Sequence, residues 1–354
     1  MELTDREALE QCRRAHDLGM DLNNARELGG YRMKDGRRIK RGLLLRTTRL
    51  CDASAEDLRR LQEEFHVSLI LDMRGEDEAA EAPDPEIPGA AILITPIIGP
   101  HVMEESVSAS AQAHQAPHTG QSGRGEQASG SSRTDQPRQL PDKLLALLPE
   151  GTDPADLSDQ KKARKIFDEM MAKDPTFLFK LIAATADLSD MTGSYAAYLK
   201  SDFGQKGFRR FFRGILDTEE GAVLWHCLTG KDRTGIGAAL LLSILGADWD
   251  TILMDYELSN LYFEDRVKAA EESLAAEGYD RKVIDSITCL VGVHPDMLIR
   301  AWQYMEEAFG SVENYLKEAI GLTEEDFEVL RERYLEQAAG DGDFEPCNKV
   351  IGER

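Results

Sequence analysis

A cysteine and an arginine, Cys227 and Arg233, are separated by five residues in the segment HCLTGKDRTG (226–235). The apolar run AVLW precedes this segment and IGAALLLSILG follows it, which predicts a buried strand, a tight turn and a helix. Backbone N–H groups at the start of such a helix converge on an anion such as phosphate or sulfate. A thiol at this position, near Lys231 and Arg233, loses its proton below the ordinary thiol pKa, so Cys227 is a predicted nucleophile.

The expected chemistry is phosphoryl transfer through a cysteinyl-phosphate intermediate that water later hydrolyses. Arg233 would hold two phosphate oxygens with its planar guanidinium, together with the loop N–H groups. Because this reaction depends mainly on positioning and charge stabilisation, we predict no metal and no cofactor. A nucleotide-binding GxxxxGK[ST] loop is excluded, since Trp225 stands where its first glycine should be and Asp232 replaces its metal-binding hydroxyl.

Other residues of the segment have predicted supporting roles. Asp232 is the nearest candidate for the acid that protonates the leaving oxygen, and Asp72, at the end of another predicted strand, is the second candidate. Thr234 could donate its hydroxyl to the departing sulfur, and His226 is expected to shape the loop through hydrogen bonds to the backbone. The predicted substrate-binding residues are Leu228, Thr229, Gly230, Lys231 and Thr234.

A purely structural role stays open for several residues. Cys227 could be a small core residue, although the C-x5-R spacing followed by Thr-Gly favours a nucleophile. Asp232 could only fix the loop through hydrogen bonds. Arg26, Arg46 and Arg74 could each pair with a carboxylate and orient a strand end. The residues expected to form a solvated basic helix face are Lys206, Arg209, Arg210 and Arg213.

Strands and helices alternate along the chain, which predicts an α/β fold whose sheet is covered on both faces by helices. Short apolar runs predict strands near residues 43, 68, 91 and 222. Asp35 and Gly36 can form a tight turn, so residues 28–46 are predicted to be a β-hairpin.

Residues 54–65 are predicted to form an amphipathic helix, with Ser54 as N-cap and Asp57 at the capping-box position. The run AVLWHC (222–227) is the last predicted strand. Only helices are expected after it, including C-terminal helices over residues 249–338.

Residues 101–141 differ from the rest of the chain in composition. They are rich in Ser, Gln, Gly, Ala and His and hold almost no large apolar side chains, so burial cannot compensate for the entropy of ordering them. We expect a disordered insertion within a single domain that spans residues 1–354. Helical periodicity returns after it, and residues 156–203 are predicted to form a helical lid beside the catalytic loop.

The chain has 65 acidic and 42 basic residues and a formal net charge of −23. This charge argues against a general nucleic-acid or anionic-membrane binder, so an anionic ligand needs a local positive pocket. The five cysteines have no paired spacing, which indicates reduced thiols rather than disulfides or a zinc site. The apolar stretches are too short to span a bilayer and the N-terminus lacks the pattern of a secretion signal, so we expect a cytoplasmic protein.

The segment HCLTGKDRTG resembles the signature loop of the Cys-based protein tyrosine phosphatase superfamily, and its GKDRTG core resembles the atypical, bacterial-type family. Further stretches are similar to that family: NNARELGGYRMKDGRRIKRGLLLR (23–46), LILDMRGEDE (69–78), DYELSN (255–260) and GSVENYLKEAIGLTEEDFEVLRERYL (310–335). The resemblance covers nearly the whole chain apart from the insertion. Glu27 stands where the family has Asp, and Thr47-Thr48 stand where it has Ser-Gly or Ser-Ala, in the pocket wall around Arg46.

The resemblance implies a protein tyrosine phosphatase-like fold with a central, mostly parallel sheet. It implies that the acid is Asp232, because the sequence lacks the Trp-Pro-Asp tripeptide of a separate acid loop. The implied partners are phosphorylated proteins, carrying phosphotyrosine and also phosphoserine or phosphothreonine, and phosphoinositides, which the extra cation Lys231 would favour.

Two alternatives stay open. A pseudophosphatase would bind phosphorylated partners without turnover, and a rhodanese-like sulfurtransferase would also use a cysteine in an anion-binding loop. Arg233 followed by Thr234 favours the phosphatase.

Overall fold

The computed structural model describes residues 3–99, 147–149, 152–153, 156, 160–185 and 193–338. The chain divides into two compact units. The first unit, residues 1–100, 190–268 and 288–354, contains the sheet and the predicted catalytic loop. The second unit, residues 101–189 and 269–287, contains α6 (Gln160–Lys173) and α7 (Phe177–Thr185).

The described strands are β1 (Arg26–Glu27), β2 (Arg37–Ile39), β3 (Leu44–Thr47), β4 (Val67–Asp72), β5 (Ala91–Ile94), β6 (Ala222–His226) and β7 (Leu335–Gln337). One sheet has the order β1-β3-β6-β4-β5, and β2 pairs with β7 in a second one. Within the larger sheet β1 is antiparallel to β3 and all other neighbours are parallel. The predicted mostly parallel sheet is therefore confirmed, and all four strand predictions fall within it.

The remaining described helices are α1 (Leu3–His16), η1 (Leu50–Asp52), α2 (Ala55–Glu63), α3 (Glu76–Glu81), α8 (Ser194–Lys200), α9 (Asp202–Asp217), α10 (Asp232–Leu245), α11 (Trp249–Glu257), α12 (Ser259–Tyr262), α13 (Glu264–Ala276), α14 (Arg281–Val291), α15 (Pro295–Phe309), α16 (Val312–Tyr315), the π-helical η4 (Leu316–Ile320) and α17 (Glu324–Tyr334). Within the described part of the chain, no helix is both long enough and apolar enough to cross a membrane.

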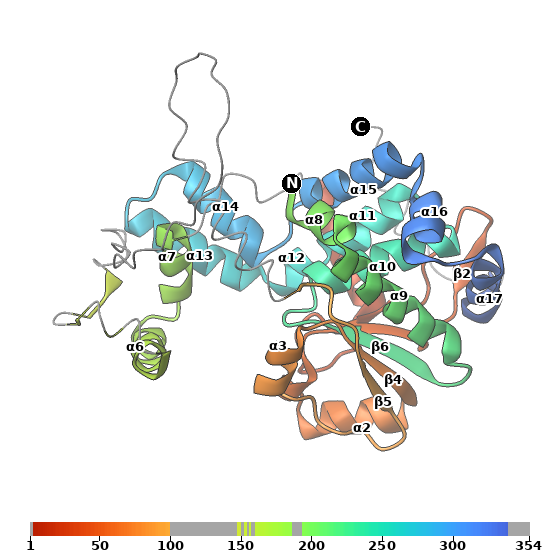
Figure 1. The fold of residues 1–354 in the computed structure, drawn as a ribbon, viewed down its shortest axis with the longest axis horizontal. Coiled ribbons are helices and arrows are strands. Elements are labelled where there is room, and N and C mark those ends of the chain that lie inside the picture. The colour runs from red at the N-terminus through yellow and green to blue at the C-terminus, as the bar shows by residue number, and fades with distance from the viewer. Residues whose placement is uncertain are drawn as a thin grey trace, which may run out of the picture. The chain divides into compact units, whose positions relative to one another are not determined.

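Side chains of the central strand β6 alternate between two apolar clusters on opposite faces of the sheet. Val223 and Trp225 point into the cluster that α9 and α10 complete. Leu224 points to the other face, where Leu61 of α2 lies. Figure 1 shows α9 and α10 on one side of the sheet and α2 on the other. Because side chains alternate along a strand, the buried sequence of β6 serves both helix layers.

The sheet order sets the position of the predicted loop. β6 lies between β3 and β4 and runs parallel to both, with Thr47 and Asp72 in register with His226. The carboxyl ends of these strands therefore meet at one edge, where binding sites of parallel sheets are usually found. Residues that follow β3 and β4 can contact the loop that follows β6.

Local signals predicted two features of the first hundred residues. The helix predicted over residues 54–65 is confirmed as α2, and Ser54 and Asp57 form the expected capping box. The hairpin predicted over residues 28–46 is confirmed only at its turn, where Gly36 has a φ of 86°. Apart from one isolated bridge, the strands of this segment pair with other parts of the chain: β2 pairs with β7, and β3 joins the main sheet. β3 is buried along its whole length and therefore needs neighbouring strands on both sides.

The prediction that only helices follow residue 227 is wrong near its end. α17 ends at Tyr334, and the next residues form β7, in which Leu335 lies opposite Ile39 of β2. Leu and Glu favour helix in isolation, but pairing here satisfies backbone groups of β2 and buries Leu335.

Several predictions concern residues that the structure places only in part. The predicted insertion over residues 101–141 lies outside the described residues. Of the predicted lid over 156–203, α6 and α7 belong to the second unit, whereas α8 and α9 belong to the first. The lid and the single domain therefore stay predictions. Among the described cysteines, Cys12, Cys51, Cys227 and Cys289, the structure has no disulfide.

Candidate active site

The predicted loop lies between the end of β6 and the start of α10, as the sequence indicates. Gly230 has a φ of 67°, and a Cβ there would collide with the carbonyl group of Thr47, so both the backbone conformation and the space require glycine. The carbonyl oxygen of Gly230 accepts hydrogen bonds from Asn24 Nδ2 at 2.9 Å and Arg46 Nη2 at 3.0 Å. These contacts fix the middle of the loop against β3 and the residue Asn24, which precedes β1.

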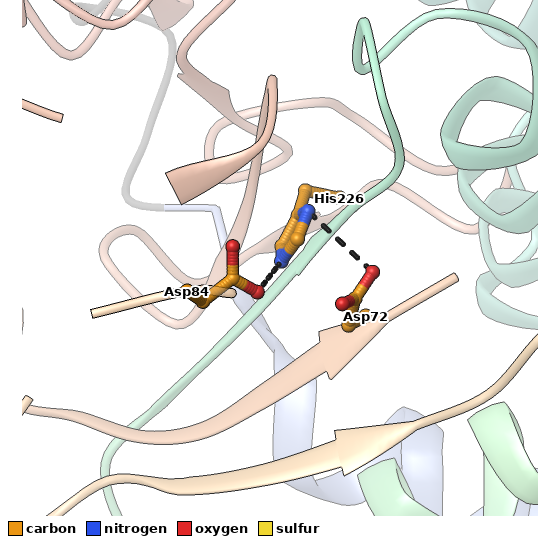
Figure 2. A group of neighbouring side chains, drawn as sticks. All are labelled: Asp72, Asp84 and His226. Carbon is orange, nitrogen blue, oxygen red and sulfur yellow. Dashed lines mark ion pairs between the residues drawn. The ribbon is translucent and has the colours of Figure 1, made fainter. Parts of the chain in front are cut away.

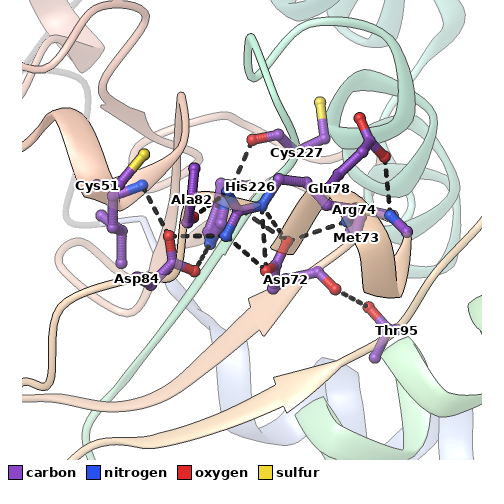
Figure 3. A network of polar contacts seen from close by, with 12 residues as sticks. Cys51, Asp72, Met73, Arg74, Glu78, Ala82, Asp84, Thr95, His226 and Cys227 are labelled. Carbon is purple, nitrogen blue, oxygen red and sulfur yellow. Dashed lines mark hydrogen bonds and ion pairs between the residues drawn. The ribbon is translucent and has the colours of Figure 1, made fainter. Parts of the chain in front are cut away.

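Cys227 directly follows β6 and is buried. Burial alone would raise the pKa of its thiol, but the positive charge of Arg233 and the polar groups of Thr234 outweigh burial and lower the pKa below the ordinary thiol value. Figure 3 shows Sγ pointing away from His226, on the side where Glu78 lies. The surroundings of this sulfur therefore favour a thiolate.

Arg233 forms a bidentate ion pair with Glu78 of α3. Nη1 donates to Oε2 at 2.6 Å and Nη2 donates to Oε1 at 3.1 Å. Partial burial opposes the charged form of Glu78, but Arg233 outweighs it and lowers the pKa of this carboxyl. The N–H of Gly75 also donates to Glu78, at 2.8 Å. Glu78 is thus anchored by the backbone and sets the direction of the guanidinium.

Two side chains hold the carboxylate of Asp232. Tyr195 Oη donates to Oδ1 at 2.5 Å, and Lys231 Nζ lies 2.7 Å from Oδ2. The Asp232 side chain is 28% exposed, whereas Lys231 is buried. A carboxyl group that is held in place and still reached by water can take up and give up a proton, as a general acid must.

The other predicted substrate-binding residues share the loop but differ in exposure. Leu228 is 40% exposed and Thr229 is half-buried. The carbonyl oxygen of Leu228 accepts a hydrogen bond from Thr48 Oγ1 at 2.9 Å, so one of the two threonines that depart from the family pattern supports the loop. Thr234 is buried, and its carbonyl oxygen accepts a hydrogen bond from Trp225 Nε1 at 3.1 Å.

His226 belongs to a buried ion-pair network with Asp72, Asp84 and Arg74 (Figures 2 and 3). Its Nε2 lies 2.8 Å from Asp84 Oδ2, and its Nδ1 lies 3.1 Å from the carbonyl oxygen of Cys227. Burial opposes a charged imidazole, but Asp84 outweighs burial and raises the pKa of His226. These contacts support the predicted role of His226 in shaping the loop.

Three members of this network could supply metal ligands. One atom each of Asp72, Asp84 and His226 lies within 4.8 Å of the others. Arg74 Nη2, however, lies 2.8 Å from Asp72 Oδ2 and 3.0 Å from Asp84 Oδ1. Because this guanidinium would repel a metal cation, the cluster fits an ion-pair network better than a metal site.

Asp72, the second candidate acid, does not have the surroundings that an acid needs. It is 1% exposed, and Arg74 donates hydrogen bonds to both of its carboxylate oxygens. The structural alternative for Arg74, a pair with a carboxylate, is what the structure shows. Of the two candidates, Asp232 is the one that water reaches.

Arg46 is predicted to support the site, and a purely structural role stays open for it. It is fully buried, and its Nη1 donates to Asp255 Oδ2 at 2.6 Å. Arg26 Nε donates to the other oxygen, Oδ1, at 3.1 Å. Burial and the neighbouring charge of Arg26 lower the pKa of Arg46 to about 10. Arg46 therefore supports the loop from inside, through Gly230, and Asp255 compensates two buried charges.

The basic face of α9 is exposed, as expected. This holds for all four of its residues, Lys206, Arg209, Arg210 and Arg213. Arg209 Nε donates to the carbonyl oxygen of Ile320 at 2.6 Å, and Arg213 forms an ion pair with Asp326 at 3.0 Å. Two of the four basic side chains thus join α9 to η4 and α17.

The sequence reasoning missed four residues that position the site: Glu78, Asp84, Tyr195 and Asp255. Glu78 ends the stretch LILDMRGEDE and Asp255 begins DYELSN, so family-like motifs were signals for these two. Tyr195 carries no such signal, because nothing in its local pattern indicates that it faces Asp232 across the fold.

Comparison with known proteins agrees with this geometry. Residues 20–336 match the profile of the tyrosine phosphatase family. A Cupriavidus necator protein, provisionally named a tyrosine-protein phosphatase, is 27% identical to this chain over 323 residues. The matched residues cover 90% of this chain and 89% of that protein. A tyrosine-protein phosphatase of Nostoc commune is 30% identical over 181 residues, which cover 47% of this chain and 60% of that protein.

The triple specificity protein phosphatase PtpB of Mycobacterium tuberculosis is 32% identical over 106 residues, which cover 27% of this chain and 38% of that protein. The family match extends over the sheet, the loop and the C-terminal helices, and it confirms the resemblance drawn from the motifs. This chain belongs to the tyrosine phosphatase family and is a phosphatase.

Proposed function

We propose that this phosphatase hydrolyses phosphate monoesters, phosphotyrosine first among them, through a cysteinyl-phosphate intermediate on Cys227. The observation that carries the proposal is the placement of a thiol with a lowered pKa at the start of a loop whose helix brings in Arg233. A cysteine with only a packing role would have its pKa raised by burial, without a compensating cation.

In the first step the Cys227 thiolate attacks phosphorus, so the S–P bond forms as the bond from phosphorus to the ester oxygen breaks. Arg233 and the N–H groups of residues 228–233 stabilise the other phosphate oxygens. The leaving oxygen keeps the electron pair of the broken bond and takes a proton from Asp232. The phosphate is then bound covalently to sulfur.

In the second step water attacks phosphorus and gives one proton to Asp232. The S–P bond breaks, the thiolate is regenerated and inorganic phosphate leaves. The buried hydroxyl of Thr234, which helps lower the pKa of Cys227, stabilises the departing sulfur.

The substrate range is proposed to extend to phosphoserine, phosphothreonine and phosphoinositides. Lys231 adds a second cation next to the loop, and in the structure it pairs with Asp232. A substrate with more than one phosphate would engage both Lys231 and Arg233. The name of the Mycobacterium tuberculosis relative, a triple specificity phosphatase, supports a broad range.

The test is steady-state phosphate release from phosphotyrosine, phosphoserine and phosphothreonine peptides and from phosphoinositides, with and without EDTA. Cys227→Ser should lower turnover by at least about 10⁴-fold, because an alcohol is a far weaker nucleophile than a thiolate. Vanadate should inhibit the wild type, and EDTA should leave turnover unchanged. Cys51→Ser, at a half-buried cysteine, is the matched control and should retain activity.

Three results would contradict the proposal. Full activity of Cys227→Ser would remove the intermediate. Binding of phosphopeptides by the wild type without phosphate release would indicate a pseudophosphatase, and sulfur transfer from thiosulfate would indicate a sulfurtransferase.

A further inference from the structure

A tyrosine from α8 reaches the carboxylate that is proposed as the acid. Tyr195 Oη lies 2.5 Å from Asp232 Oδ1, and Tyr256 Oη of α11 lies 3.0 Å from Tyr195 Oη. We propose that Tyr195 is a positioning residue, which fixes Asp232 so that its other oxygen delivers the proton to the leaving group. This inference rests on the proposed role of Asp232.

The surroundings determine the direction of the hydrogen bond. Tyr195 is buried, and its ring packs edge-on against that of Tyr256. Burial and the negative charge of Asp232 raise the pKa of Tyr195 well above its ordinary value, so the hydroxyl keeps its proton. Tyr256 donates to the oxygen of Tyr195, which leaves the single proton of Tyr195 for Asp232.

The two oxygens of Asp232 have different partners. Oδ1 accepts from Tyr195, a buried side chain that faces inward, whereas Oδ2 contacts the cation Lys231 at 2.7 Å. A phosphate bound in the loop attracts Lys231 away from Oδ2. Oδ2 is then free to carry the proton, while the bond from Tyr195 keeps the carboxyl group from rotating.

The dependence of the rate on the leaving group tests this role. A general acid matters most for a poor leaving group and least for a good one. Tyr195→Phe keeps the buried ring and removes only the hydroxyl. It should lower kcat/KM about tenfold for phenyl phosphate and less than about twofold for 2,4-dinitrophenyl phosphate.

A double-mutant cycle shows whether Tyr195 acts through Asp232. Asp232→Asn should show the same dependence on the leaving group, with a larger loss. Adding Tyr195→Phe to Asp232→Asn should cost nothing further, because the group that Tyr195 positions is already gone. Inhibition by inorganic phosphate should be unchanged in Tyr195→Phe, which shows that the folded loop is intact.

The matched control is Tyr315→Phe. Tyr315 Oη donates to the carbonyl oxygen of Leu199 at 3.1 Å, and Leu199 lies on α8, the helix that carries Tyr195. This variant therefore removes a hydrogen bond to α8 without changing the contacts of Asp232. It should leave the rates with both substrates unchanged.

Suppose that the rate of Asp232→Asn still depends on the leaving group. Equal losses for both substrates in Tyr195→Phe, or additive losses in the double-mutant cycle, would then overturn the role of Tyr195 but not that of Asp232. No such dependence in Asp232→Asn would overturn the proposed acid itself.

Discussion

The two sides of the catalytic loop both use arginine–carboxylate pairs, but in different surroundings. On the outer side Arg233 pairs with Glu78, whose side chain is 37% exposed. On the inner side Arg46 pairs with Asp255, and both side chains are buried. Arg233 is itself buried, so only the Glu78 side of the outer pair is open to water and substrate. The inner pair is buried on both sides and leaves an uncompensated charge when one partner is lost. Burial therefore decides whether such a pair serves chemistry or stability.

The largest expected effect is on the inner side. Asp255→Asn leaves Arg26 and Arg46 buried without their carboxylate, so the free energy of unfolding should fall by about 3–5 kcal/mol. Urea denaturation followed by circular dichroism measures this loss.

Glu336→Gln is the matched control for Asp255→Asn, because it breaks a pair with Arg38 in which both side chains are partly exposed. Its expected cost is below about 1 kcal/mol. Similar losses in the two variants would break the distinction between the two kinds of pair.

A smaller effect, on activity rather than stability, is expected on the outer side. Glu78→Gln removes the charge that directs Arg233, so kcat/KM for p-nitrophenyl phosphate should fall by about tenfold. The free energy of unfolding should fall by less than in Asp255→Asn, because the Glu78 side chain is partly exposed. Glu76→Gln, at an exposed position of the same helix, should change neither quantity. A Glu78→Gln enzyme with normal activity but much lower stability would place this pair with the scaffold.

The smallest effect concerns the pH dependence of the buried network. Burial opposes both charges, but in the folded protein Asp84 raises the pKa of His226, and His226 lowers the pKa of Asp84. The contribution of His226 to stability is full below its unfolded pKa, about 6.5, and is lost as pH rises through the folded pKa. The contribution of Asp84 is full above its unfolded pKa, about 3.9, and is lost as pH falls through the folded pKa.

The pair should therefore contribute most between about pH 4 and pH 6.5. Between about pH 6 and pH 9, urea denaturation should show a fall in the free energy of unfolding that is larger for the wild type than for Asp84→Asn. The slopes of this free energy against pH should differ by at most about 1.4 kcal/mol per pH unit. Parallel pH profiles of the two proteins would show that His226 is not charged in the folded state.

Local patterns predicted most of the fold and the centre of the site. The apolar runs predicted each strand of the parallel part of the sheet, and the segment from Cys227 to Arg233 predicted the loop between strand and helix. β7 was missed because its sequence favours helix, and only its pairing with β2 makes it a strand. The sequence left open whether Arg46 supports the loop or only pairs with a carboxylate, because its partners Asp255 and Gly230 lie far from it along the chain.

The sequence by itself determined the reactive group and the loop that surrounds it, because a strand, a glycine turn and a helix start are set by residues that are neighbours in the chain. Only the tertiary structure decided which carboxylate each arginine meets and which hydroxyl holds Asp232. Glu78 meets Arg233 across 155 positions, and Tyr195 meets Asp232 across 37. Such partners are chosen by the packing of α3 and α8 around the sheet, and no local pattern of residues specifies that packing.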